Sequence, residues 1–275
     1  MYPPQGMEVD KGLVCRLKCA LYGLKISPLT WFRRFDEAAK KMQFNNHPNE
    51  PCVYIWRKKH LVVILVLYVD DFLITGNCKD KIVETIRRLK EEFQVKELGS
   101  PKKFLGLEIS RSEEYQTLSL TQTSFIKCVL KRFNALHLPS VQTPEITRNS
   151  EKKSPKSEKK TPEWNPGKPT PGKSLFREIT GSLLHLANGT RPDIMFATNV
   201  LCQHQNKPQK EDWERAQRIL QYLKGTAELG LTYKGVIEKE GVFVDAYTDA
   251  SLGTGDEGCS ITGYFVRAYG DPVVW

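Results

Sequence analysis

Apolar positions recur with a helical and a strand period along the first 144 residues of the chain. Helical spacing is clear in residues 30–44, where Trp31, Phe35, Ala38 and Met42 form one stripe. Two short apolar runs flank the polar segment 57–60, a pattern typical of a β-hairpin. The predicted elements are a helix over 30–44, strands over 52–56, 61–67 and 72–75, a helix over 80–93, strands over 103–110 and 117–120, and a helix from 123 to 133. This order predicts an α+β fold.

The pattern changes twice after residue 144. Residues 145–173 are rich in Pro, Ser and Lys and carry seven Lys and one Arg against four Glu, so we expect a solvated linker. Residues 174–241 return to helical spacing, with Pro192 and Pro208 near helix starts and Gly225 at a helix end. Residues 242–275 read as strands and are too few to close a domain, so we expect only the beginning of one.

Composition narrows the class of protein. The sequence has no apolar run of about 18 residues and no signal-like start, which predicts an intracellular protein that is neither membrane-bound nor secreted. Its seven cysteines form no CxxC pair, and its five histidines show no zinc spacing. The linker holds +4 of the net charge of +9, so charge alone gives little support for a nucleic-acid partner.

Asp70 and Asp71 interrupt the most apolar stretch of the chain, "LVVILVLYVDDFLITG" at residues 61–76. Buried side by side, two carboxylates would be desolvated and would repel each other. We therefore expect them at an exposed hairpin tip, where paired carboxylates suit Mg²⁺. Nucleotidyl transfer uses such ions. An ordinary Asp-Asp turn is the alternative.

The residues around this turn resemble the polymerase hairpin of reverse transcriptases. The blocks "CRLKCALYGLKISPLTWFRRF", "EPCVYIW", "VKELGSPKKFLGLEI", "LSLTQTSFIKCVLKRF", "REITGSLLHLANGTRPDI" and "ILQYLKGTAELGL" also follow the order of copia-type retrotransposon Pol polyproteins. The resemblance implies a partial right-hand polymerase palm and thumb over 1–144, without the fingers and first catalytic strand, and a helical connection over 174–241. It also implies the truncated start of a ribonuclease H-like domain over 242–275.

The resemblance implies catalytic and metal-binding roles for Asp70 and Asp71, and for Asp249 of "AYTDAS" in the ribonuclease H-like part. It implies Mg²⁺ as cofactor, and an RNA template, a DNA primer and an RNA–DNA hybrid as partners. As a lone motif, "TDAS" is more typical of a strand-end turn.

The chain departs from the family pattern at two positions of "YGLKISPL". Ile26 stands where the family has a glutamine near the incoming nucleotide, and Leu29 replaces a basic residue. We expect both active sites to be incomplete and the isolated chain to lack polymerase activity. Three hypotheses remain open: an RNA-directed DNA polymerase, an inert remnant of one, or a non-catalytic nucleic-acid-binding or domesticated module.

Overall fold

A computed structural model describes residues 2–3, 6–7, 10, 12–112, 114, 116–145, 173–234, 243–253 and 260–275. The chain divides into two compact units, Met1–Ser100 and Pro101–Trp275, called here the first and the second unit. Each unit contains both helices and strands, which confirms the α+β class. In the part that the structure describes, no helix is long and apolar enough to cross a membrane.

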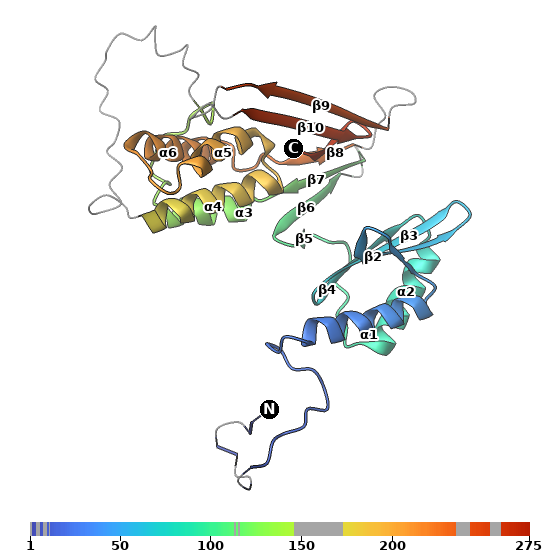
Figure 1. Cartoon of the computed structure of the whole chain (residues 1–275). Helices are drawn as coiled ribbons and strands as arrows, with labels where there is room; N and C mark the ends of the chain where they lie inside the picture. Colours follow the sequence, from blue (N-terminus) through green and yellow to red (C-terminus); the bar gives the residue numbers. More distant parts are fainter. Residues whose placement is uncertain are drawn as a thin grey trace, which may run out of the picture. The chain divides into compact units, whose positions relative to one another are not determined.

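The first unit is an antiparallel sheet with two helices (Figure 1). Its four strands follow the order β1-β2-β3-β4, so each strand pairs with its neighbour in sequence. The elements are α1 (Ser27–Lys41), β1 (Asn45–His47), β2 (Glu50–Lys58), β3 (Leu61–Tyr68), β4 (Asp71–Gly76) and α2 (Lys79–Glu92).

Strand alternation places the core of the first unit on one face of this sheet. Val63, Leu65 and Leu67 of β3 are buried, and the residues between them are only partly buried. They pack in one cluster with Phe35 of α1 and Leu89 of α2. Both helices therefore cover the same face of the sheet, which holds β3 and β4 rigidly.

The second unit contains two further antiparallel sheets and a group of helices. One sheet has the order β5-β6-β7-β8, and the other has the order β11-β10-β9. The elements are β5 (Lys103–Phe104), β6 (Leu107–Ser112), β7 (Thr117–Thr121), α3 (Thr123–Arg132), α4 (Lys173–Gly189), the 3₁₀ turn η1 (Pro192–Ile194), α5 (Met195–Gln203), α6 (Lys210–Gly225), β8 (Leu231–Tyr233), β9 (Val244–Ser251), β10 (Ile261–Ala268) and β11 (Asp271–Val274).

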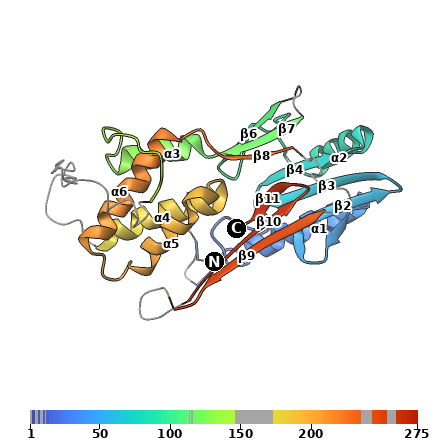
Figure 2. The ribbon, with the colours of Figure 1, turned by 90° about the horizontal axis from the view of Figure 1, so that it is seen from above.

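Helices α3 to α6 lie together (Figure 2). They share the largest hydrophobic core of the described residues. Ile126, Phe176, Leu201 and Leu220, one from each helix, are all fully or almost fully buried in it. Because α3 precedes residues 145–173 and α4 follows them, the core joins parts that the sequence assigns to different domains. The boundaries predicted from the sequence remain predictions.

Most predicted elements are present, with local differences. Strands β1 and β8 were not predicted, and the predicted strand 103–110 is divided into β5 and β6 by a turn in which Leu105 and Gly106 have positive φ. Pro192 begins a 3₁₀ turn rather than an α-helix. The predicted linker lies outside the described residues except at its two ends.

Candidate catalytic hairpin

Asp70 and Asp71 lie at the tip of the hairpin formed by β3 and β4. Tyr68 pairs with Asp71, so Val69 and Asp70 form a two-residue turn. Both aspartates are exposed to solvent. The predicted exposed turn is confirmed, and neither carboxylate is desolvated in a core.

Val69 gives this turn an unusual backbone conformation. Its φ of 51° lies in the left-handed region, which a β-branched residue rarely adopts. The Nε1 of Trp31 donates a hydrogen bond to the carbonyl oxygen of Val69 at 2.6 Å. Trp31 belongs to α1, so the helix holds the tip of the hairpin through this bond.

Trp31 packs in an aromatic cluster with rings from α1, from the start of β4 and from the residue that follows α2. The ring centroid of Trp31 lies 5.2 Å from that of Phe93, and Phe35 lies 5.8 Å from Phe93. Phe72, which directly follows the second aspartate, packs 6.1 Å from Phe35. Rings in contact at these separations restrict one another's movement. The cluster therefore restricts the movement of the hairpin tip that carries the two carboxylates.

Tyr22 contacts the catalytic candidate directly, because its hydroxyl donates a hydrogen bond to Oδ2 of Asp70. This bond, and the negative charge of Asp70, raise the pKa of the Tyr22 hydroxyl above its usual value. No periodicity or charge pattern in the sequence points to Tyr22. Its only signal was its place in "ALYGLKISPLTWFRRF", the block that also contains Trp31.

Asp70 and Asp71 could together provide carboxylate oxygens to a divalent cation. Carboxylate oxygen is the ligand that Mg²⁺ prefers, and the exposed tip leaves room for the ion to keep waters. The donor chemistry therefore fits the ion. Among the residues described here, no group of three or more His, Cys, Asp or Glu side chains forms a ready metal site.

Asp249, the third predicted site residue, belongs to the second unit. It lies on β9, opposite Gly263 of β10, and its side chain is exposed. Its Oδ1 accepts a hydrogen bond from the amide of Ala250. On the same face of β9, Asp245 is paired with Arg267 at 2.7 Å. The predicted antiparallel meander is present, and the metal-binding role of Asp249 remains a prediction.

An ion pair between the buried Arg191 and the more exposed Asp193 organises the helices of the second unit. Arg191 is 1% exposed, and its Nε and Nη2 donate to the carboxylate of Asp193 at 2.9 and 2.7 Å. The Tyr222 hydroxyl donates to the same carboxylate at 2.8 Å. Burial alone would raise the pKa of Asp193, but the bonds and charge of Arg191 outweigh it and lower that pKa. This cluster explains "TRPD" as a structural motif.

Two other sequence blocks meet at the start of α3. Glu108 of "FLGLEIS" accepts a hydrogen bond from the amide of Ser124 at 2.8 Å. Hydrogen bonding to Ser124 lowers the pKa of the Glu108 carboxyl. Gln122, which precedes the helix, accepts a bond from the hydroxyl of Thr190 at 3.0 Å. These two blocks thus pack together at the junction of β6, α3 and the end of α4.

Comparison with known proteins identifies the family. A family model described as reverse transcriptase (RNA-dependent DNA polymerase) matches residues 1–147. The Retrovirus-related Pol polyprotein from transposon TNT 1-94 of Nicotiana tabacum is 35% identical over 100% of this chain and 20% of its own length. The polyprotein from transposon RE2 of Arabidopsis thaliana is 34% identical over 99% of this chain and 18% of its own length.

A transposon Ty5-1 protein of Saccharomyces cerevisiae is 30% identical over 98% of this chain and 82% of its own length. The chain spans about a fifth of the length of the two plant polyproteins. No solved structure matches it. The chain belongs to the reverse transcriptase family, within the copia-type retrotransposon Pol polyproteins.

Proposed function

We propose that Asp70 and Asp71 are metal-holding carboxylates of an RNA-directed DNA polymerase that uses an RNA template and a DNA primer. The exposed position of both carboxylates at a rigid hairpin tip carries this proposal. Membership of the reverse transcriptase family supports it.

In this role, bound divalent ions would supply the charge that activates the attacking hydroxyl and stabilises the leaving pyrophosphate. The contribution of this chain is to position the carboxylates. Trp31 fixes the backbone at Val69, and Tyr22 orients the carboxylate of Asp70 by occupying one of its oxygens. Tyr22 and Trp31 are positioning residues on this proposal.

We expect that the 275 residues alone do not extend a primer. Two carboxylates displace few waters from Mg²⁺, which keeps its hydration shell unless several ligands converge. The side chains of Ile26 and Leu29 are 67% and 51% exposed, and neither can donate a hydrogen bond to a nucleotide or template. Their positions in the family motif suggest weakened substrate contacts.

Primer extension on an RNA template, with Mg²⁺ or Mn²⁺, tests this proposal. We expect no extension by the wild-type chain or by the Asp70→Asn/Asp71→Asn variant. Extension that is lost in the variant would contradict the proposed inactivity while supporting the role of the two aspartates. Extension that survives in the variant would refute that role.

We also propose that Asp249 corresponds to the first metal-binding carboxylate of a ribonuclease H-like site. Its place on the first strand of an antiparallel meander supports this assignment. One exposed carboxylate offers Mg²⁺ little that water does not, so we expect no cleavage of RNA in an RNA–DNA hybrid. Cleavage abolished by Asp249→Asn would contradict this expectation.

Non-catalytic binding of nucleic acid is the alternative, and the surface of α3 favours it. Lys127 and Lys131 are exposed on this helix, and neither forms an ion pair with any of the residues that the structure describes. Lysines of this kind contact phosphates without reading sequence. Salt-dependent binding to an RNA–DNA hybrid, weakened by Lys127→Gln/Lys131→Gln, would support this alternative.

A further inference from the structure

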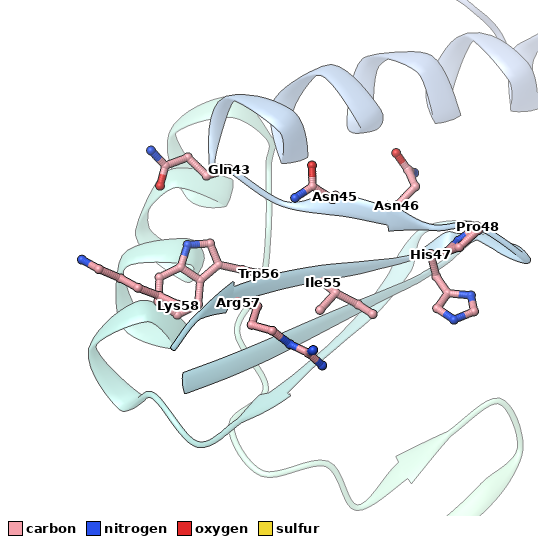
Figure 3. Close-up of a pocket in the computed structure, with 9 residues that line it drawn as sticks. All are labelled: Gln43, Asn45, Asn46, His47, Pro48, Ile55, Trp56, Arg57 and Lys58. Atoms are coloured by element: carbon pink, nitrogen blue, oxygen red, sulfur yellow. The ribbon is translucent and has the colours of Figure 1, made fainter. Parts of the chain in front are cut away.

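An open depression lies along the β1–β2 edge of the first unit (Figure 3). Its volume is about 500 Å³, in the range of ligand-binding pockets. Its Trp56 end lies about 17 Å along the strand from the hairpin tip, because Trp56 pairs with Val63, five residues before Tyr68. Its other end is nearer the tip, because His47 pairs with Glu50 at the start of β2. The lining residues are Gln43, Asn45, Asn46, His47, Pro48, Ile55, Trp56, Arg57 and Lys58.

The charge of this depression is entirely positive. Its lining includes Arg57 and Lys58, and it includes no carboxylate. Arg57 and Lys58 are exposed, and neither forms an ion pair within the described part of the chain. On α2, in contrast, Arg87 and Lys90 are paired with glutamates at 2.5 and 2.7 Å. The depression therefore presents free positive charge to a ligand.

The remaining walls combine carboxamides with apolar surface. Gln43 and Asn45 offer both donors and acceptors, and Asn46 is fixed by donating to the carbonyl of Pro51 at 2.9 Å. Ile55 and Trp56 are half-buried and provide the apolar part. The ammonium of Lys81 lies 5.3 Å from the Trp56 ring centroid and anchors the indole. Phosphate-binding cations beside an aromatic wall are typical of single-strand binding surfaces.

We propose that this depression binds a single-stranded segment of RNA or DNA. Arg57 and Lys58, which extend from opposite faces of β2, contact its phosphates at the edge of the sheet, while a base lies against Trp56 and the carboxamides bond its polar edge. The choice of nucleic acid over another polyanion rests on the proposed function, because a polymerase handles single strands of template. The depression then guides a strand along the β1–β2 edge of the same sheet that carries Asp70 and Asp71.

The test uses the full 275-residue chain and a fluorescein-labelled 12-nucleotide oligouridylate, with fluorescence anisotropy measured at several salt concentrations. Each phosphate contact on a single strand contributes a slope of about 0.7 in log K against log salt, or roughly fivefold in affinity at 0.1 M salt. We expect Arg57→Gln/Lys58→Gln to weaken binding roughly 25-fold and to lower the slope by about 1.4. The matched control Arg87→Gln/Lys90→Gln removes the same charge and should change affinity less than about threefold.

A second readout locates the contact. An oligonucleotide carrying 4-thiouridine should crosslink to the tryptic peptide 42–57 of the wild-type chain. Thermal melting should show that the Arg57→Gln/Lys58→Gln variant remains folded. Unchanged affinity and slope in that variant, or crosslinks only outside the peptide, would overturn the proposal.

Competitors distinguish the other possible ligands. Polyglutamate that displaces the oligonucleotide, with the same dependence on Arg57 and Lys58, would indicate a site for acidic proteins instead. Displacement by AMP at an equal phosphate concentration would indicate a mononucleotide site. The Asp70→Asn/Asp71→Asn variant should bind the oligonucleotide with the affinity of the wild type. The binding result therefore tests the depression independently of the proposed role of the two aspartates.

Discussion

Replacing Asp193 by Asn should destabilise the helical core of the second unit by about 2 kcal/mol at pH 7. Asn keeps the shape of the side chain but removes the charge that compensates Arg191, whose side chain is 1% exposed. Removing one partner of a fully buried pair costs about 3–5 kcal/mol. The Asp193 side chain is 35% exposed, and Arg191 keeps its bonds to Thr226 at 2.8 and 2.7 Å, so we expect a smaller loss.

The pH dependence of this difference has a definite sign. The folded protein lowers the pKa of Asp193, so the ion pair adds stability only where the carboxylate is ionised. That stability is fully present above the unfolded pKa of about 3.9 and is lost as the pH falls through the lower folded value. Wild type and Asp193→Asn should therefore differ at pH 7 and converge in strong acid.

Hydrogen exchange followed by mass spectrometry measures the effect within the second unit alone. Buried amides of α5 and α6 should exchange about 30-fold faster in Asp193→Asn at pH 7, the equivalent of about 2 kcal/mol. The control Glu178→Gln breaks an exposed pair with Arg132 and should change exchange by less than about fivefold. A less than twofold difference in exchange rate between wild type and Asp193→Asn at pH 7, or a difference that persists unchanged below pH 3, would refute the reasoning.

Three further substitutions test other contacts. Trp31→Phe removes the hydrogen bond to Val69 but keeps an aromatic ring. The backbone amides of β3 and β4 should then exchange hydrogen faster by the equivalent of about 1 kcal/mol, and unchanged exchange would show that the bond does not hold the hairpin tip. Glu108→Gln should destabilise α3 by about 0.5–1 kcal/mol at pH 7, as measured by urea titration. The destabilisation should disappear below the lowered pKa of Glu108, where the wild-type carboxyl is also uncharged, so an equal destabilisation at pH 2 would exclude a charge-based cap. Gly189→Ala places a methyl group 2.4 Å from Oε1 of Gln122 and should lower the thermal midpoint through about 1–3 kcal/mol of overpacking, so a neutral result would mean that Gln122 moves aside freely.

The sequence predicted the hairpin because its signal is local. Alternate burial along β3 and two adjacent charges after it leave one arrangement in which the core stays apolar and the carboxylates stay solvated. The same reasoning predicted most helices, whose apolar stripes are long. Three-residue strands such as β1 and β8 carry too little periodicity to be recognised.

Contacts between distant residues explain what the sequence could not predict. Tyr22 and Asp70 are 48 positions apart, and their bond depends on how the N-terminal segment passes the hairpin tip. The burial of Arg191 depends on Tyr222 in α6 and on Thr226 just after that helix, so the residues next to Arg191 in sequence do not reveal it. Polar side chains whose hydrogen-bond partners come only from tertiary packing leave no periodic signal in the sequence.

Titration of Mn²⁺ into the chain, observed through paramagnetic broadening of backbone amide resonances, tests the central claim most directly. If Asp70 and Asp71 form a divalent-metal site, millimolar Mn²⁺ should selectively broaden the amides of residues 68–72, and Asp70→Asn/Asp71→Asn should abolish the effect. Absence of broadening at the tip, or equal broadening in the variant, would contradict the account.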